Sequence, residues 1–370
     1  MKIFYFITKS EAGGAQTQVF QLAKYFSSRG HEVAVMSYPG GWLEEECNKI
    51  GVKFFGNKYF SNNLNPLNIL KAIRKIKKSI REFKPDLINC HSSAAGVLVR
   101  LVVHNSVPTI FNAVGWSFNV GVPTVQKYLG IWSEKIATPF CDMIICNSRF
   151  VKDLGLKYGV GKEEKYRVIY NGVENDPLLS KKNPEVNEKI KIIFVARLAE
   201  PKDPLMFLAG YQGLKLEIKN QTEVVIVGDG PKMKEAVEYV KVNNLQNNVI
   251  FLGNVQREKV FETLSLGDVF ALCTKWESFP YTVIEGMFAG LACIASNVGG
   301  IGEALDKNCG VLVENTTEQW TEKLEFILKN REEIKNMGLR GKERALRDFS
   351  VEKMFEETEK VYLEILKKYA

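Results

Sequence analysis

Residues 174–189, ENDPLLSKKNPEVNEK, interrupt an otherwise regular alternation of apolar and amphipathic segments. The stretch is polar, holds two prolines and has few apolar anchors, which is typical of a linker between domains. On either side of it, short apolar runs such as 2–8 (KIFYFIT) and 190–196 (IKIIFVA) alternate with helical patterns. Parallel strands need a crossover connection, so repeated strand–helix units predict a doubly wound parallel sheet in each half.

The predicted elements follow one another in the same way in both halves. Expected strands lie at 2–8, 32–37, 52–55, 86–90, 108–112 and 142–146, then at 190–196, 223–228, 248–252, 268–272 and 292–295. Expected helices lie at 15–29, 42–50, 66–83, 94–104, 123–138, 203–213, 231–243, 257–265, 280–289, 317–329, 331–347 and 350–369. We therefore predict an α/β protein with an N-terminal domain at 1–173, a linker at 174–189 and a C-terminal domain at 190–349. The last helix, in 350–370, has one apolar face to bury.

Composition favours an ordinary globular protein. The 370 residues are 45% hydrophobic and 25% charged, and their number fits two domains. Seven scattered cysteines without a C-x-x-C pair, and only three histidines, argue against a disulfide framework or a structural zinc site. No apolar run approaches the ~18 residues of a spanning helix, and segment 3–7 is short for a signal-peptide core. These features predict a cytoplasmic protein without a bound metal.

The excess of positive charge lies in the first half. Residues 1–180 hold 23 cationic and 14 acidic side chains, a balance of +9, whereas the remainder carries −2. The stretch 71–84 (KAIRKIKKSIREFK) concentrates this charge, and its candidates for contact with an anionic membrane are Arg74, Lys75, Lys77, Lys78 and Arg81. A core-packed surface helix with solvated lysines is the alternative interpretation. Nucleic acid is not expected, because no basic groove with interleaved aromatic residues is present.

Four residues of the second half form a candidate phosphate and sugar site. Arg197 and Lys202 follow the predicted strand 190–196, where two cations suit a diphosphate. Glu277 and Glu285 flank a predicted helix start at Pro280, so both carboxylates can face one cleft and accept bonds from sugar hydroxyls. In the first half, Gly13 and Gly14 begin a helix after the first strand and allow an anion to approach backbone N–H groups, or else form a tight turn.

These residues together resemble the retaining family 4 glycosyltransferases of GT-B fold, of the bacterial surface-polysaccharide type. The resemblance is carried in order by 13–15 (GGA), 171–174 (NGVE), Arg197 with Lys202, 228–231 (GDGP), 251–254 (FLGN) and 277–285 (ESFPYTVIE). It implies two Rossmann-like domains, the first for the acceptor and the second for the donor, with the last helix packing back on the first domain. It also implies a nucleotide-sugar donor, expected to be a UDP-sugar, and a glycan or lipid-linked acceptor, and no further cofactor.

The resemblance also implies roles for individual residues. Arg197 and Lys202 would neutralise the donor diphosphate, so that these two cations take the place of a metal ion. Glu277, with the backbone at Ser278 and Phe279, would hold the donor sugar, while Glu285 would hold the ribose. The segment around Asn254 and Val255 would bracket the base. Gly14, next to Gly13, would approach the phosphates from the first domain.

One position departs from the family pattern. Many relatives have a histidine before a Gly-Trp-x-Phe segment, and here 113–118 reads AVGWSF with Val114 in its place. His91, after the fourth strand, and Trp116 are the acceptor-side candidates, although a structural His91 is an equal alternative. Two rival functions stay open: a sugar-nucleotide epimerase of the same fold, and a degraded sugar-nucleotide-binding subunit that supports a partner enzyme.

Overall fold

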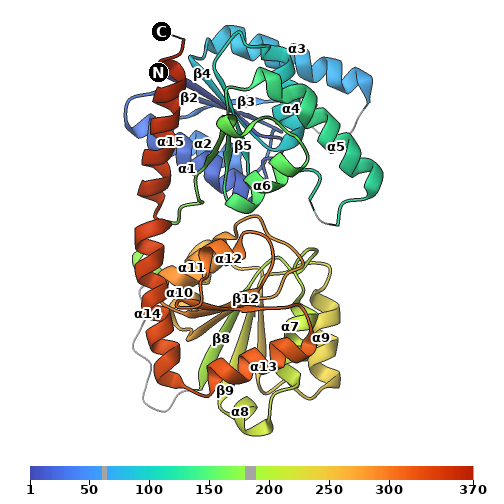
Figure 1. Cartoon of the computed structure of the whole chain (residues 1–370), viewed down its shortest axis with the longest axis vertical. Coiled ribbons are helices and arrows are strands. Elements are labelled where there is room, and N and C mark those ends of the chain that lie inside the picture. Colours follow the sequence, from blue (N-terminus) through green and yellow to red (C-terminus); the bar gives the residue numbers. More distant parts are fainter. Residues whose placement is uncertain (61–64, 120, 180–188, 370) are drawn as a thin grey trace. The chain divides into compact units, whose positions relative to one another are not determined.

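The computed structural model describes residues 1–60, 65–119, 121–179 and 189–369, and the chain forms two compact units (Figure 1). The first unit comprises Met1–Asn171 together with the chain from Met354 onward, and the second comprises Gly172–Lys353. In the polar segment expected as a linker, Pro177–Leu179 form a 3-10 turn, η3, and residues 180–188 lie outside the described residues. Each unit is a parallel sheet between layers of helices, which is the predicted α/β class.

The sheet of the first unit has the strand order β3-β2-β1-β4-β5-β6-β7, and all its pairs are parallel. The strands are β1 (Lys2–Phe6), β2 (Glu32–Ser37), β3 (Lys53–Gly56), β4 (Leu87–His91), β5 (Thr109–Ala113), β6 (Met143–Cys146) and β7 (Tyr166–Val168). The order reverses between β1 and β4, so the loops after these two strands diverge and leave room for a ligand at the carboxyl edge of the sheet.

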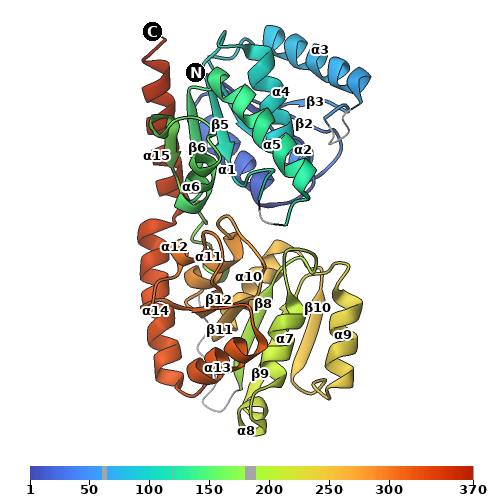
Figure 2. The same ribbon diagram turned by 45° about the vertical axis from the view of Figure 1, so that its right-hand side comes forward.

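Helices cover both faces of this sheet (Figures 1 and 2). Right-handed crossovers place α1 and α2 on one face and α3, α4 and α5 on the other. The helices are α1 (Gly14–Ser28), α2 (Trp42–Lys49), α3 (Pro66–Phe83), α4 (Ser93–Val103), α5 (Thr124–Ala137) and α6 (Arg149–Lys157), with 3-10 turns η1 (Thr138–Phe140) and η2 (Glu163–Lys165). The last helix, α15 (Val351–Leu366), joins the first unit from Met354 onward. There Phe355 stacks on Tyr25 at 4.2 Å and Tyr362 on Phe26 at 5.1 Å, both from α1.

The sheet of the second unit has the order β10-β9-β8-β11-β12-β13, again with parallel pairs. Its strands are β8 (Ile190–Val195), β9 (Thr222–Val227), β10 (Val249–Gly253), β11 (Val269–Leu272), β12 (Ala292–Ser296) and β13 (Gly310–Val313). Its helices are α7 (Pro204–Gln212), α8 (Leu216–Asn220), α9 (Met233–Val242), α10 (Arg257–Ser265), α11 (Tyr281–Phe288), α12 (Ile301–Ala304), α13 (Thr317–Leu328) and α14 (Arg331–Asp348).

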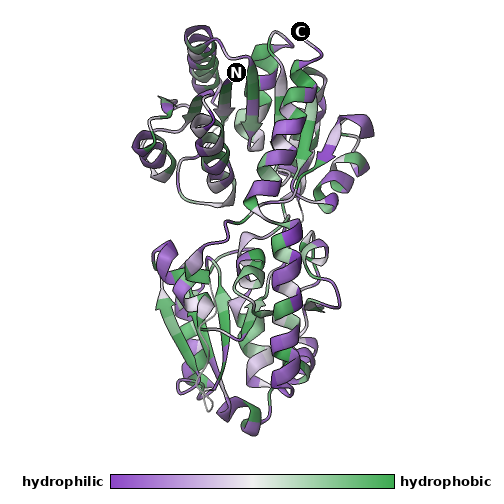
Figure 3. Ribbon diagram, turned by 90° about the vertical axis from the view of Figure 1, so that its left-hand side faces the viewer, coloured by the Kyte–Doolittle hydropathy of each residue, from purple (hydrophilic) through white to green (hydrophobic). Residues whose placement is uncertain are grey.

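Local sequence explains where the helices begin, and burial on both faces explains why the strands are apolar. The side chain of Asn65 accepts a bond from the N–H of Leu67 before Pro66 opens α3, and Asp203 caps α7 in the same way before Pro204. The central strands are apolar on both faces because helices cover both, and Figure 3 shows them as green bands between helices striped with purple.

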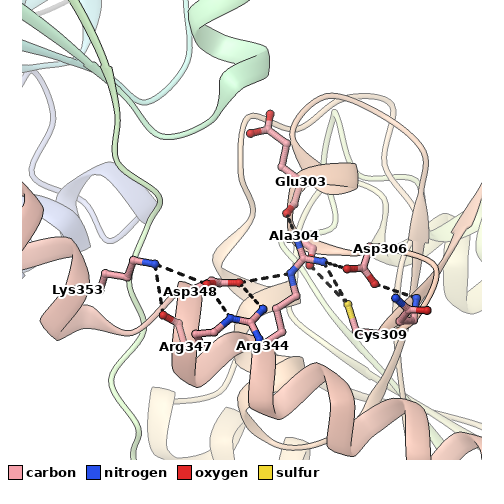
Figure 4. Close-up of polar contacts among 9 residues, drawn as sticks. Glu303, Ala304, Asp306, Cys309, Arg344, Arg347, Asp348 and Lys353 are labelled. Atoms are coloured by element: carbon pink, nitrogen blue, oxygen red, sulfur yellow. Dashed lines mark hydrogen bonds and ion pairs between the residues drawn. The ribbon is translucent and has the colours of Figure 1, made fainter.

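Arg344 of α14 fixes the loop after α12 (Figure 4). Its guanidinium pairs with Asp306, lies 3.9 Å from Asp348 and donates to the carbonyl oxygen of Glu303 at 2.9 Å. One mostly buried cation thus holds the loop between α12 and β13, and further ion pairs of Asp348 with Arg347 and Lys353 continue the cluster.

Five strands and α-helices were not predicted. They are the edge strands β7 and β13, and the helices α6, α8 and α12. The two strands have only three and four residues, and each pairs on one side alone. Such short runs carry too little periodicity to be separated from loops.

Candidate active site

A cavity of about 720 Å³ opens at the carboxyl edge of the second unit's sheet. Its walls come from the loops after β8, β9 and β10 and from the first turn of α11. Lining residues include Arg197, Gly228, Gly230, Asn254, Val255 and Thr282. Ligands of open parallel sheets bind at this edge, so the cavity lies where the sequence places the donor site.

Two glycines allow the floor of the cavity to form. Gly228 and Gly230 have φ of +123° and +157°, and a Cβ at either would overlap the carbonyl oxygen of Ala196 or of Leu198. The backbones are this close because the N–H of Ala196 donates to Val227 at 3.1 Å and that of Leu198 to Asp229 at 3.0 Å. The GDGP sequence therefore has a steric cause: only glycine lets the loop after β9 pass against the loop after β8.

Arg197 is the cation on the cavity wall. It follows β8, its side chain is exposed, and no ion pair holds it within 1–60, 65–119, 121–179 and 189–369. Its guanidinium is consequently available for an anion, for which the planar fork of donors suits two phosphate oxygens.

Lys202 and Glu277 are paired with each other. Their side chains are 17% and 15% exposed and form an ion pair, and an antiparallel bridge joins Lys202 to Thr274. Burial lowers the pKa of the Lys202 ammonium to about 7, while the neighbouring carboxylate favours the charged form. The structure thus brings these two predicted residues together as an ion pair. Neither side chain lines the cavity.

The loop that carries Glu277 is held by its backbone. The N–H of Gly300 donates to the Glu277 carbonyl at 3.1 Å, and a Cβ on Gly299 would overlap the same oxygen. Ser278 and Phe279 are buried, and Phe279 packs edge-on against Phe349 at 5.3 Å. Any contact of this segment with a sugar would thus come from the Glu277 carboxylate and from backbone groups.

Glu285 lies on α11 one turn beyond Thr282, and Asn254 and Val255 line the cavity after β10. Burial raises the pKa of Glu285, and the guanidinium of Arg257 acts in the opposite direction. The neighbouring hydroxyl of Tyr281 is buried and makes no hydrogen bond among the described residues. A ligand with hydroxyl groups would offer hydrogen-bond partners to such acceptors and donors.

Two further lysines support the loop that contains Lys202, and sequence reasoning missed them. Lys232 and Lys275 both pair with Glu200, at 2.9 and 2.8 Å, and Lys232 also donates to the carbonyl of Lys202 at 2.8 Å. These contacts lower the pKa of Glu200. The position of Lys232 directly after GDGP was the available signal, because that turn returns the chain to the loop after β8.

In the first unit, Gly13 and Gly14 begin α1 as predicted, with Gly13 as the extended residue before the helix. His91 ends β4 but is fully buried, with both ring nitrogens lacking hydrogen-bond partners among the described residues, and burial lowers its pKa to about 3. Trp116 is also buried and donates to the Val151 carbonyl at 2.7 Å. Both acceptor-side candidates therefore lie inside the unit in this structure, His91 without charge.

The described part of the chain holds no group of three or more His, Cys, Asp or Glu side chains placed to bind a metal ion. None of its helices combines the length and the apolar character needed to cross a bilayer.

Comparison with known proteins assigns a family description to each half of the chain. Residues 12–176 match "Glycosyltransferase Family 4", and residues 175–344 match "Glycosyl transferases group 1". The chain is 31% identical over 278 residues to the UDP-Gal:alpha-D-GlcNAc-diphosphoundecaprenol alpha-1,3-galactosyltransferase of Escherichia coli, covering 68% of each protein. It is 28% identical over 350 residues to the O-antigen biosynthesis glycosyltransferase WbnH of Escherichia coli, covering 91% of this chain and 93% of the relative.

Solved structures show the same fold along the whole chain. HepE of Anabaena, solved in complex with UDP and glucose, superposes with a TM-score of 0.81 at 18% identity, covering 98% of this chain and 99% of that one. A glycosyltransferase from Rickettsia africae gives 0.82 at 22% identity, covering 99% and 98%. Family models match both halves of the chain in order, and each half is a parallel-sheet unit of Rossmann type. The chain therefore belongs to the family 4 glycosyltransferases of GT-B fold.

Proposed function

We propose that the protein transfers a sugar from a UDP-sugar to a glycan or lipid-linked glycan acceptor in the synthesis of a surface polysaccharide. The observation that carries the proposal is the cavity at the carboxyl edge of β8, β9 and β10, which Arg197, without an ion pair among the described residues, lines together with Gly228 and Gly230. HepE is a structural neighbour solved with UDP and glucose, and the galactosyltransferase relative is named for a diphosphoundecaprenol acceptor. These names support the donor and acceptor classes.

In this proposal residues 190–349 form the donor domain and residues 1–173 the acceptor domain, with the helix in 350–370 as part of the latter. The base lies against Asn254 and Val255, and the ribose hydroxyls donate to Glu285. Arg197 binds the diphosphate directly. Lys202 turns from Glu277 to the diphosphate, which frees the Glu277 carboxylate to accept bonds from the donor sugar.

The chemistry follows from stabilisation of the leaving group. As the bond between the anomeric carbon and the diphosphate breaks, negative charge grows on the phosphate oxygens and positive charge on the sugar ring. Arg197 and Lys202 stabilise the first, and the carboxylate of Glu277 stabilises the second. An oxygen of the departing diphosphate takes the proton of the acceptor hydroxyl, which attacks from the same face, so the anomeric configuration is retained. The two cations supply the charge that a metal ion would otherwise provide.

The proposal includes contact with an anionic membrane through α3. Arg74, Lys75, Lys77, Lys78 and Arg81 are all exposed on this helix. Its one acid, Glu82, is already paired with Lys53 at 2.8 Å. The exposed surface of α3 is thus strongly positive, as expected for a helix that contacts anionic headgroups.

Turnover of nucleotide sugars tests the proposal. The purified protein is incubated with a panel of UDP-sugars and membrane lipid extract, and released UDP is measured with and without a chelator. Release should depend on the extract, survive the chelator and be abolished by Arg197→Ala, and NMR of the product should show the donor's anomeric configuration. Glu332→Gln, at an exposed glutamate on α14, is the control. Inertness with every donor would refute the enzyme assignment and favour a binding subunit. A product in which only the donor sugar has changed configuration would favour an epimerase.

A further inference from the structure

Helix α5 has its apolar residues on the outside. Five large apolar side chains are each more than half exposed, and they recur at helical spacing along one face. We call them the α5 stripe: Val125, Tyr128, Leu129, Trp132 and Ile136. A surface helix of a globular protein normally turns such a stripe toward the core, so this one is reversed.

The inner face of α5 is fixed by a buried ion pair. Glu134 accepts from the guanidinium of Arg100 on α4 at 2.6 Å, and both side chains are fully buried. Arg100 also donates to the Gly96 carbonyl at 2.9 Å and lies 4.1 Å from the centre of the Phe111 ring. Rotating α5 to bury the stripe would break this pair and expose a charge network, so the stripe is a permanent surface feature.

Apart from the buried Glu134, the charged side chains of α5 are lysines. Lys127 and Lys135 flank the stripe, with the ammonium of Lys135 5.6 Å from the Trp132 ring. Helix α4, which packs between α3 and α5, contains no acidic residue. Helices α3, α4 and α5 lie along the same face of the sheet (Figure 2). We therefore expect the stripe and the basic surface of α3 to meet the same partner.

We propose that α5 inserts its stripe into the interface of an anionic lipid bilayer while α3 contacts the headgroups. Helices that lie in a membrane interface typically carry tryptophan and tyrosine beside lysine on an apolar stripe without exposed acids, and α5 has this composition. The proposal deepens the membrane contact in the proposed function and rests on it. A flat protein partner fits less well, because the cations of α3 would need a matching acidic surface at the same place.

The stripe also begins at the functional edge of the sheet. Strand β5 ends at Ala113 at the carboxyl edge, and α5 is the next helix along the chain, starting at Thr124. Insertion of α5 would hold this edge of the first unit next to the bilayer. A lipid-linked acceptor that diffuses in the membrane would then meet the unit at the edge where ligands of parallel sheets bind.

Vesicle binding tests the proposal with the full chain. Sedimentation with vesicles of phosphatidylglycerol and phosphatidylcholine is compared for wild type, Leu129→Ser/Trp132→Ser and the matched control Leu216→Ser/Phe326→Ser, whose positions are similarly exposed on the second unit. The stripe variant should bind about tenfold more weakly or worse, because it loses two large interfacial side chains, and the control should bind as wild type. Trp132→Phe should keep binding but lose most of the blue shift of tryptophan fluorescence on vesicle addition.

Three outcomes would overturn the proposal. They are unchanged binding of the stripe variant, equal binding of wild type to pure phosphatidylcholine, and a wild-type oligomer in light scattering that the stripe variant converts to monomer. Thermal unfolding of each variant verifies that it is folded. UDP affinity, measured without vesicles, tests the donor site separately. A protein that fails to bind UDP would refute the proposed function. Vesicle binding would still decide the role of α5.

Discussion

The substitution Gly228→Ala probes whether the donor site depends on the close approach of two loops. Gly228 has φ of +123°, and an added Cβ would overlap the carbonyl oxygen of Ala196. Gly253 offers a matched control, since its φ is +68° but a Cβ there meets nothing within 4 Å. Both substitutions strain the backbone, and only Gly228→Ala adds a clash at the cavity floor.

The expected magnitudes follow from these contacts. A non-glycine residue at positive φ costs about 1–3 kcal/mol of unfolding free energy, which applies to both variants. Gly228→Ala must also separate the two loops, which weakens the 3.1 Å bond between the N–H of Ala196 and the carbonyl of Val227. A buried backbone group left without a partner costs about 1–3 kcal/mol more. Arg197 directly follows Ala196 in the chain, so a shift of Ala196 would move the guanidinium as well. Displacing that guanidinium from a phosphate would lose a charged hydrogen bond worth about 1.5–3 kcal/mol, or roughly ten- to hundredfold in UDP affinity.

Calorimetric titration with UDP and urea unfolding measure both quantities. Gly228→Ala should bind UDP roughly ten- to hundredfold more weakly than wild type, as the loss of that hydrogen bond predicts. It should also unfold at a lower urea concentration than Gly253→Ala. Gly253→Ala should lose stability while keeping UDP affinity near that of wild type. The reasoning is refuted if the two variants unfold at the same urea concentration and bind UDP equally well.

Three further predictions concern other contacts. Glu134→Gln should lower the unfolding free energy by about 3–5 kcal/mol in urea denaturation, because it leaves the buried guanidinium of Arg100 without a counter-charge, and a loss below about 1 kcal/mol would contradict this. UDP affinity should fall up to about tenfold per pH unit above about pH 7, since the proposed binding of the diphosphate by Lys202 requires its charged form and burial lowers the pKa of Lys202 to about 7. Lys202→Arg should flatten that profile in calorimetric titrations, and a flat wild-type profile would argue against the role. Arg344→Met should cost about 1–3 kcal/mol in urea unfolding by releasing Asp306 and the loop after α12, and an unchanged midpoint would show that the cluster in Figure 4 contributes nothing.

Much of the fold could be predicted because parallel sheets leave a strong sequence pattern. Strands covered on both faces are continuous apolar runs, and the segments between them have helical periodicity, so β8 and α3 lie close to their predicted ranges. The pattern fails at the sheet edges. Among the residues that the structure describes, strand β7 pairs only with β6, and β13 only with β12, so neither needs a long apolar run to be stable.

The sequence predicts where several candidate residues lie, but not which side chains pair with one another. Residues at strand ends, such as Arg197 and Asn254, could be placed because the fold sends every strand end to one edge. The pairing of Lys202 with Glu277 depends on side-chain directions across 75 residues, which spacing does not encode. The same holds for Lys232, which supports the backbone at Lys202.

Helix α5 shows why an amphipathic pattern does not reveal which face is buried. Its sequence carries apolar side chains on both faces, Ile131 and Ala137 inside and the α5 stripe outside, and the pattern predicts the helix without its orientation. A rule that buries the larger apolar face would turn Trp132 inward and Glu134 outward. The opposite occurs because Arg100, at the centre of α4, needs a buried counter-charge, and Glu134 is the only acid on α5 that can supply it. The ion pair therefore decides which surface α5 presents: an apolar stripe beside Lys127 and Lys135, in the same unit that carries the basic helix α3.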